Sequence, residues 1–180
     1  TMTLPSATQH ISPIWSRSST IIAERGEGAY LYTTDGRKLL DFTCGIGVTN
    51  TGHAHPRIVK AIQDQAAKLL HGQANIVYHQ PMLNLVDELL KIVPEKLNSF
   101  FFSNSGAEIL EGAVKLAKHA TKRPNIIVFD GSFHGRTHLT MSMTTSKTVY
   151  RVGYQPLLAG IFVTPYPYAY KLEMSEDETT

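Results

Sequence analysis

The pattern of hydrophobic and polar positions predicts a β-rich first part of the chain. Residues 28–43, "GAYLYTTDGRKLLDFT", hold two β-favouring runs on either side of Asp35-Gly36. Because Asp-Gly between two such runs favours a tight turn, we predict a β-hairpin here. Residues 1–20 are interrupted by prolines and are expected to form an arm that lies on another part of the protein.

Two helices are predicted in the middle of the chain. Pro56 suits the first turn of a helix, and apolar residues recur behind it at helical spacing. A second helix is expected over about residues 80–93, where Pro94 stops it. The apolar stripe expected on the first helix contains Ile58, Ile62, Ala66 and Leu69.

Strands and helices alternate over the remaining residues. Buried strands are predicted at 99–103 ("SFFFS"), at 125–131 ("NIIVFDG") and at 159–167 ("AGIFVTPYP"), with a helix over 106–120. This alternation implies βαβ units, and hence an α/β fold with a mainly parallel sheet. The residues of the 106–120 helix expected to face inward are Ile109, Ala113, Leu116 and Ala117.

Two loops follow predicted strands and are expected at one edge of this sheet. They are residues 103–107 and 131–138. Ligands of open α/β sheets bind beyond the carboxyl ends of the strands. Both loops are therefore candidates for a ligand site.

Composition narrows the function classes. The chain has 180 residues, 42 % hydrophobic and 18 % charged, with a net charge of +2 and no basic run, so nothing indicates a nucleic-acid surface. Its single cysteine, Cys44, excludes an internal disulfide framework and favours a reducing, cytoplasmic location. No apolar run approaches the roughly 20 residues of a membrane span, and the N-terminal residues do not resemble a signal peptide.

The first candidate loop, "SNSGAE", allows two compatible interpretations. Ser105 can cap the following helix, and Glu108 three residues later completes the S-x-x-E pattern of a capping box. Alternatively, the unpaired N–H groups of the helix N-terminus bind an anion, which the missing side chain of Gly106 would allow to approach closely. Neither a Walker lysine nor a G-x-G-x-x-G pattern is present, so a nucleotide site is not expected.

The second candidate loop, "DGSFHGRTH", also has two interpretations. Phe133 lies between glycines, where it either stacks on a flat ligand or is tucked into the core. His134 can hydrogen-bond a ring substituent, and the planar fork of Arg136 suits a carboxylate.

The glycine-rich segment 45–56, "GIGVTNTGHAHP", contains His53 and His55 two positions apart. A metal site is not expected, because no further histidine, cysteine or acid cluster supports it. His55 is more simply a residue at the entry of the Pro56 helix.

In this order, these segments resemble the class III (omega-type) aminotransferases, which depend on pyridoxal 5′-phosphate. The resemblance runs from about Gly26 to Tyr170 and is carried by "YLYTTDGRKLLDFTCGIGVTNTGHAHPRIVKAIQDQ", "FFSNSGAEILEGAVKLAKHAT" and "FDGSFHGRTHLTMSMT". It is strongest to the 4-aminobutyrate branch. It implies a fold-type-I homodimer, with 1–70 as an N-terminal arm and small-domain segment and 71–180 as the first, incomplete part of the cofactor-binding domain.

The resemblance also implies roles for individual residues. The cofactor phosphate is expected at Ser105, Gly106 and Ala107, and the pyridine ring under Phe133, with His134 and Gly135 beside it. Arg136 matches the arginine that holds the substrate carboxylate. Ile46 and Asn75 are expected at the substrate pocket, and Glu111 is expected to be structural support.

The implied reaction moves an amino group from an omega-amino acid to a 2-oxo acid through a Schiff base of the cofactor. In the family the Schiff-base lysine lies downstream of the last residue here, and no lysine of this chain matches its segment, so the chain alone is not expected to catalyse transamination. Its sheet is expected to be incomplete, with an open edge. Alternatives are an aminomutase or racemase on the same scaffold, and a non-catalytic dimerising fragment.

Overall fold

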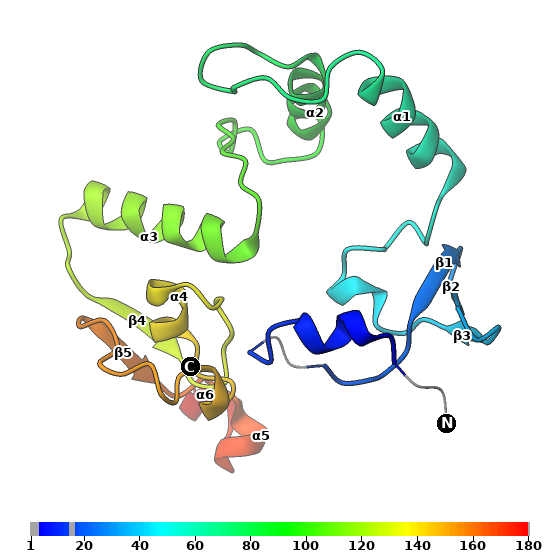
Figure 1. The fold of residues 1–180 in the computed structure, drawn as a ribbon. Coiled ribbons are helices and arrows are strands. Elements are labelled where there is room, and N and C mark those ends of the chain that lie inside the picture. The colour runs from blue at the N-terminus through cyan, green and yellow to red at the C-terminus, as the bar shows by residue number, and fades with distance from the viewer. Residues whose placement is uncertain (1–3, 15–16, 180) are drawn as a thin grey trace. The chain divides into compact units, whose positions relative to one another are not determined.

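A computed structural model describes residues 4–14 and 17–179, which form two compact units (Figure 1). The first is Thr1–Leu85 and the second Val86–Thr180, and each is described by itself. The arm expected over residues 1–20 falls partly outside the described residues. The domain boundary expected at residue 70 stays a prediction.

The first unit begins with a small antiparallel sheet whose three strands lie in the order β1-β2-β3. The predicted hairpin is confirmed: Tyr30 pairs with Leu40, and the turn between them contains Gly36 at a φ of +83°. A positive φ is open to glycine without steric cost, so this turn follows from the local sequence. The elements of the sheet and its surroundings are η1 (Ser6–His10), β1 (Ala23–Glu27), β2 (Tyr30–Thr33), β3 (Lys38–Leu40) and η2 (Cys44–Ile46).

Two helices follow, α1 (Pro56–Ala66) and α2 (Gln80–Leu90), as predicted. α2 ends at Leu90 rather than near 93, because the chain turns before it reaches Pro94. Leu69 lies beyond the end of α1, so it does not extend the predicted stripe. Within the described residues that stripe is not covered, since Ile62 is 63 % exposed.

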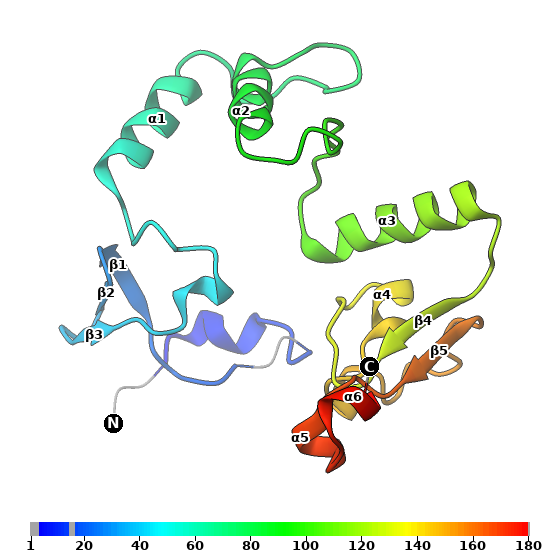
Figure 2. The same cartoon turned by 180° about the vertical axis from the view of Figure 1, so that it is seen from behind.

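The second unit is built around two parallel strands, β4 (Ile126–Phe129) and β5 (Ile161–Thr164), joined through the short helix α4 (His138–Met143) (Figure 2). The long helix α3 (Gly106–Thr121) precedes β4. The predicted helix at 106–120 and the predicted strands at 125–131 and 159–167 are thus confirmed, and the two strands pair in parallel as expected, whereas α4 between them was not predicted. The remaining elements are η3 (Thr148–Tyr150), α5 (Ala169–Leu172) and α6 (Glu176–Thr179).

The predicted strand at 99–103 is wrong. Its backbone is irregular and pairs with no strand of the described residues. Phe101 is 72 % exposed, and Phe100 and Phe102 stack on each other with ring centroids 6.4 Å apart. An apolar run favours a strand, but only a partner strand supplies the hydrogen bonds that make it one.

The face of α3 predicted to be buried is also wrong. Leu116 is 68 % exposed, whereas Val114 is buried to 7 % exposure and packs with Val128 of β4 and Met143 of α4. The sequence offers apolar residues on more than one side of this helix, so periodicity alone does not choose the side. The residues packed around this small core are Ile126, Leu139 and Ile161.

Both units leave much apolar surface uncovered. The chain exposes 15006 Å² at a mass of 19.9 kDa. A folded monomer of this mass exposes about 8,700 Å², and two separate units of half the mass about 10,400 Å². On the β4–β5 sheet, Ile127 and Phe162 are 71 % and 54 % exposed. Apolar side chains of this two-stranded sheet are therefore uncovered among the described residues, and the incomplete sheet stays a prediction.

No helix within residues 4–14 and 17–179 combines the length and the apolar composition needed to cross a membrane.

Candidate cofactor-binding site

The N-terminus of α3 is capped as the sequence predicts. Ser105 has extended backbone angles, and its Oγ accepts the N–H of Glu108 at 3.2 Å. This bond satisfies one of the donors that every helix N-terminus leaves unpaired.

The second half of the expected capping box does not form. The Glu108 carboxylate accepts from the backbone N–H and the side-chain amide of Asn104, at 2.8 and 3.0 Å, instead of from the N–H of Ser105. These bonds, the backbone one first, hold the pKa of Glu108 below its usual range. Asn104 thereby takes the carboxylate, which leaves the N–H of Ser105 free.

Together with the first N–H groups of the helix, this gives three consecutive N–H groups at the N-terminus of α3 without an acceptor in the part of the chain that the structure describes. Among the described residues, no acceptor bonds the N–H of Ser105, Gly106 or Ala107. Ser105 and Gly106 line an open hollow of about 320 Å³, and a Cβ on Gly106 would meet nothing within 4 Å. Free N–H groups and the positive end of a 16-residue helix suit a phosphate. The residues present therefore fit the phosphate end of the implied cofactor.

The second loop begins at the carboxyl end of β4 and exposes its aromatic ring. Phe133 is 55 % exposed and meets Tyr150 edge-on, with ring centroids 5.3 Å apart and an interplanar angle of 71°. The alternative in which Phe133 is tucked into the core is therefore wrong. Because Tyr150 meets it in a T-shaped arrangement, the ring is held while much of its surface remains accessible.

Hydrogen bonds and an unusual backbone conformation hold the two residues after Phe133 in place. His134 donates its N–H to Thr144 Oγ1 at 2.9 Å, and its Nδ1 lies 3.0 Å from the carbonyl oxygen of Met143. A carbonyl only accepts, so Nδ1 carries the proton in this bond. Gly135 is buried at a φ of +138°.

The structure brings the two loops together, although only the second one follows a strand, β4. A Cβ built on Gly135 would lie 2.7 Å from the Cβ of Ala107, so the Gly135 backbone packs closely against the methyl group of Ala107. One turn further along α3, Glu111 Oε1 accepts the hydroxyl of Thr137 at 2.6 Å. Glu111 thus ties the helix to the loop, in agreement with its expected supporting role.

The predicted substrate residues are distributed over both units. Arg136 is exposed, and its guanidinium forms no hydrogen bond or ion pair with any described residue. Ile46 is 98 % exposed at a φ of +58°, and Asn75 is exposed. Ile46 and Asn75 belong to the first unit and Arg136 to the second, so a shared substrate pocket stays a prediction.

The glycine-rich segment is anchored by an acid–histidine pair. Asp41 Oδ2 lies 2.7 Å from His53 Nε2, and its other oxygen accepts from the hydroxyl and N–H of Thr43 and from the N–H of Cys44. The Thr43 hydroxyl first, and then His53, lower the pKa of Asp41 to about 2.

The histidines of this segment have structural partners within the chain. Within residues 4–14 and 17–179, no group of three acids, histidines or cysteines could hold a metal ion. His55 accepts the N–H of Arg57 at the start of α1, which confirms it as a helix-entry residue.

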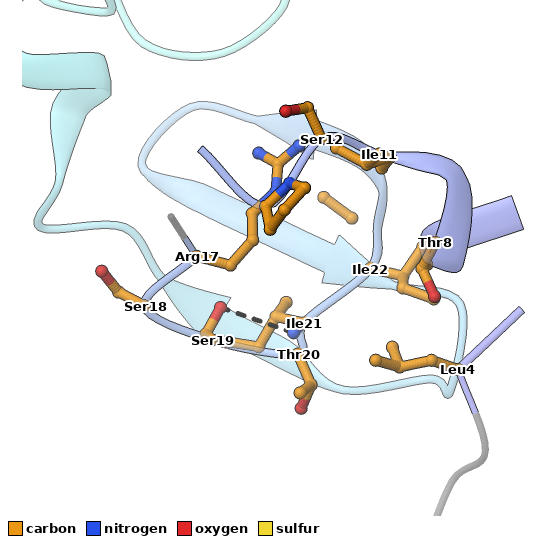
Figure 3. A pocket seen from close by; sticks show the side chains of 12 residues that line it. Leu4, Thr8, Ile11, Ser12, Arg17, Ser18, Ser19, Thr20, Ile21 and Ile22 are labelled. Atoms are coloured by element: carbon orange, nitrogen blue, oxygen red, sulfur yellow. Dashed lines mark hydrogen bonds between the residues drawn. The ribbon is translucent and has the colours of Figure 1, made fainter. Parts of the chain in front are cut away.

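Two further hollows lie elsewhere, each of about 850 Å³. One is lined by residues from 4–13 and 17–23, with Leu4, Ile11 and Ile22 among the side chains in Figure 3. Arg17 is the one titratable group among its described lining residues, so it offers no acid–base pair. The other adjoins the carboxyl ends of β4 and β5 and is mostly apolar.

Sequence reasoning missed Thr140 and Thr144, whose side chains are fully buried. Thr140 lies in α4, and Thr144 follows one turn later, directly after the helix. The hydroxyls of both residues contact the 133–137 loop. The signal was a run dense in hydroxyl residues, "THLTMSMTTSKT", directly after that loop.

Comparison with known proteins gives a consistent family. The family model described as aminotransferase class III matches residues 11–180. A probable 4-aminobutyrate aminotransferase from Bacillus subtilis (strain 168) is 40 % identical over 91 % of this chain and 38 % of that protein. An acetylornithine aminotransferase from Archaeoglobus fulgidus is 36 % identical over 96 % of this chain and 44 % of that protein.

Solved structures share the fold. A transaminase from the marine bacterium Virgibacillus matches with a TM-score of 0.82 at 23 % identity, over 95 % of this chain and 41 % of that one. The adenosylmethionine-8-amino-7-oxononanoate aminotransferase from Methanocaldococcus jannaschii matches with a TM-score of 0.79 at 29 % identity, over 89 % and 39 %. The chain therefore spans about two-fifths of the length of these relatives.

Proposed function

Because the chain belongs to the class III aminotransferase family, we propose that the whole protein moves an amino group from an omega-amino acid, such as 4-aminobutyrate, to a 2-oxo acid. Pyridoxal 5′-phosphate is the cofactor that this family membership implies. The observation that carries the proposal is the row of three free N–H groups of α3 directly beside the Phe133–Arg136 loop.

The residues of this chain supply the non-covalent part of the site. Ser105, Gly106 and Ala107 would hold the phosphate with their N–H groups, and Phe133 would cover one face of the pyridine ring. His134 and Gly135 would lie beside that ring. When bound, the cofactor supplies the electron sink that stabilises the carbanion of the amino donor.

Arg136 would set the preference for amino acids over simple amines. A planar guanidinium binds a carboxylate through two parallel hydrogen bonds, which a lysine cannot reproduce. Its exposure and its lack of an ion-pair partner among the described residues support this role. Ile46 and Asn75 would line the same pocket.

We further propose a cytoplasmic homodimer, in which 1–70 belongs to the small domain and 71–180 to the cofactor-binding domain. The 180-residue chain by itself would not catalyse transamination, since none of its lysines matches the Schiff-base segment of the family. Treatment of this chain with cofactor and borohydride should leave no lysine labelled at stoichiometric level. Stoichiometric labelling would refute that statement.

The proposed activity is tested on the full-length protein with two matched substrates. 4-Aminobutyrate and n-butylamine have the same carbon chain and differ in the carboxylate. Arg136→Lys should lower kcat/KM for 4-aminobutyrate about 10- to 100-fold, as for a lost bidentate bond to a charged group, and leave n-butylamine nearly unchanged. Arg123→Lys, just after α3, is the matched control and should change neither.

Three results would contradict the proposal. Equal losses of kcat/KM for both substrates in Arg136→Lys would contradict the carboxylate-binding role of Arg136. Isomerised product without consumption of a 2-oxo acid would favour an aminomutase or racemase. Full-length protein with no cofactor absorbance band would instead favour a non-catalytic fragment.

A further inference from the structure

A buried set of hydroxyl groups lies beneath the loop that carries Phe133 and Arg136. Thr144 is 0 % exposed, and its Oγ1 accepts the N–H of His134 at 2.9 Å and that of Gly135 at 3.3 Å. Its own proton is directed at a carbonyl, either that of Thr140 at 2.9 Å or that of Gly135 at 3.1 Å. One hydroxyl thus binds two successive peptide groups of the loop.

A second chain of hydroxyls links the same loop to α3. Thr137 donates to Glu111, and its Oγ1 lies 2.7 Å from the Oγ1 of Thr140, which is also 0 % exposed. A carboxylate only accepts, so the Thr137 proton goes to Glu111 and the Thr140 proton is left for Thr137. Thr140 Oγ1 in turn accepts the N–H of Thr137 at 3.1 Å. Each hydroxyl of this chain therefore donates one hydrogen bond toward Glu111.

The two chains meet where the candidate phosphate and ring sites meet. Gly135, whose N–H binds Thr144, is the residue whose backbone packs against the methyl group of Ala107. A small rotation of this peptide would change the position of the ring of Phe133 relative to the free N–H groups of α3. No other described hydroxyl bonds two N–H groups of this loop.

The geometry assigns to Thr144 the role of a positioning residue, assisted by the Glu111–Thr137–Thr140 chain. It holds the Phe133–Arg136 loop in place relative to the N–H groups of Ser105, Gly106 and Ala107, where the cofactor phosphate would bind. This inference rests on the proposed function. Thr144 touches neither cofactor nor substrate and acts through the peptide groups of His134 and Gly135.

The test compares two substitutions of Thr144 in the full-length protein. Thr144→Val keeps the shape and removes the hydroxyl that accepts the N–H groups of His134 and Gly135. We expect pyridoxal 5′-phosphate to bind the apoprotein about tenfold more weakly, and the visible circular dichroism of the bound cofactor to change. Thr144→Ser restores the hydroxyl and should restore both signals.

Thr33→Val is the matched control. Thr33 is 2 % exposed, and its hydroxyl is hydrogen-bonded within the β2–β3 hairpin, outside the candidate site. It should lower stability without changing cofactor affinity or dichroism. If Thr144→Val does not fold, the exposed Thr137→Val carries the test and must weaken cofactor binding in the same direction.

The outcomes separate this inference from the proposed function. Wild-type protein that takes up no cofactor overturns the proposed function, and the inference with it. Wild-type protein that binds cofactor, together with a folded Thr144→Val (or Thr137→Val) variant of unchanged affinity and dichroism, overturns only the inference. Equal changes in Thr33→Val, or a Thr144→Ser variant as weak as Thr144→Val, would also overturn it.

Discussion

Replacing Gly135 with alanine tests whether the loop and α3 lie against each other as closely as the structure shows. The new Cβ would lie 2.5 Å from Thr140 Oγ1 and 2.7 Å from the Cβ of Ala107, so the backbone must shift. Overpacking of this kind costs about 1–3 kcal/mol. The φ of +138°, which is almost restricted to glycine, adds about 1–3 kcal/mol. We therefore expect a loss of about 2–6 kcal/mol in the free energy of unfolding.

Two other glycines of the second unit separate these contributions. Gly131 has a φ of +78° but nothing within 4 Å of a Cβ, so Gly131→Ala should lose only the conformational part, about 1–2 kcal/mol. Gly106 begins α3 without a positive φ and also has open space, so Gly106→Ala should change stability by about 0.5 kcal/mol or less.

The assay is urea unfolding of the full-length protein without cofactor, followed by circular dichroism at one protein concentration. The concentration is fixed because association would shift the transition. The loss of unfolding free energy should be smallest for Gly106→Ala, larger for Gly131→Ala and largest for Gly135→Ala. A Gly135→Ala variant no less stable than Gly131→Ala would refute the close approach of the loop to Ala107 and Thr140.

Three further predictions follow from local contacts. Ser105→Ala should cost about 0.5–2 kcal/mol by urea unfolding, and Ser105→Gly only a few tenths, because an alanine neither caps the helix nor favours the N-cap backbone; equal losses would contradict the cap. The pKa of Asp41 is lowered to about 2 from 3.8, so its bonds stabilise the folded state above pH 4 and this stability is lost as the pH falls from about 4 to 2. The stability difference between wild type and Asp41→Asn should therefore shrink over that window, and a difference that grows on acidification would show the opposite linkage. Val114→Ala should cost about 1–3 kcal/mol in the free energy of unfolding, and Leu116→Ala about 0.5 kcal/mol or less, because Val114 is buried and Leu116 is exposed. The reverse order in thermal unfolding would show that α3 buries the face predicted from the sequence.

The sequence by itself determined the features that depend on neighbouring residues. The hairpin turn at Gly36, the entry of α1 at His55 and the Ser105 cap were all predicted and are all present. Each depends on interactions that span no more than about four positions. The family resemblance likewise rests on residue order alone, and the class III match over residues 11–180 confirms it.

Only the tertiary structure decided how these pieces meet. It showed that residues 99–103 pair with no strand of the part that the structure describes, and that α3 buries Val114. It also placed Gly135 against Ala107, 28 positions earlier, and Thr144 beneath the loop. Such contacts depend on partners that are distant in the sequence, and a helix with apolar residues on several sides does not encode which side is covered. The candidate residues could therefore be chosen from the sequence, but the free N–H groups and the hydroxyls that hold the loop beside them could not.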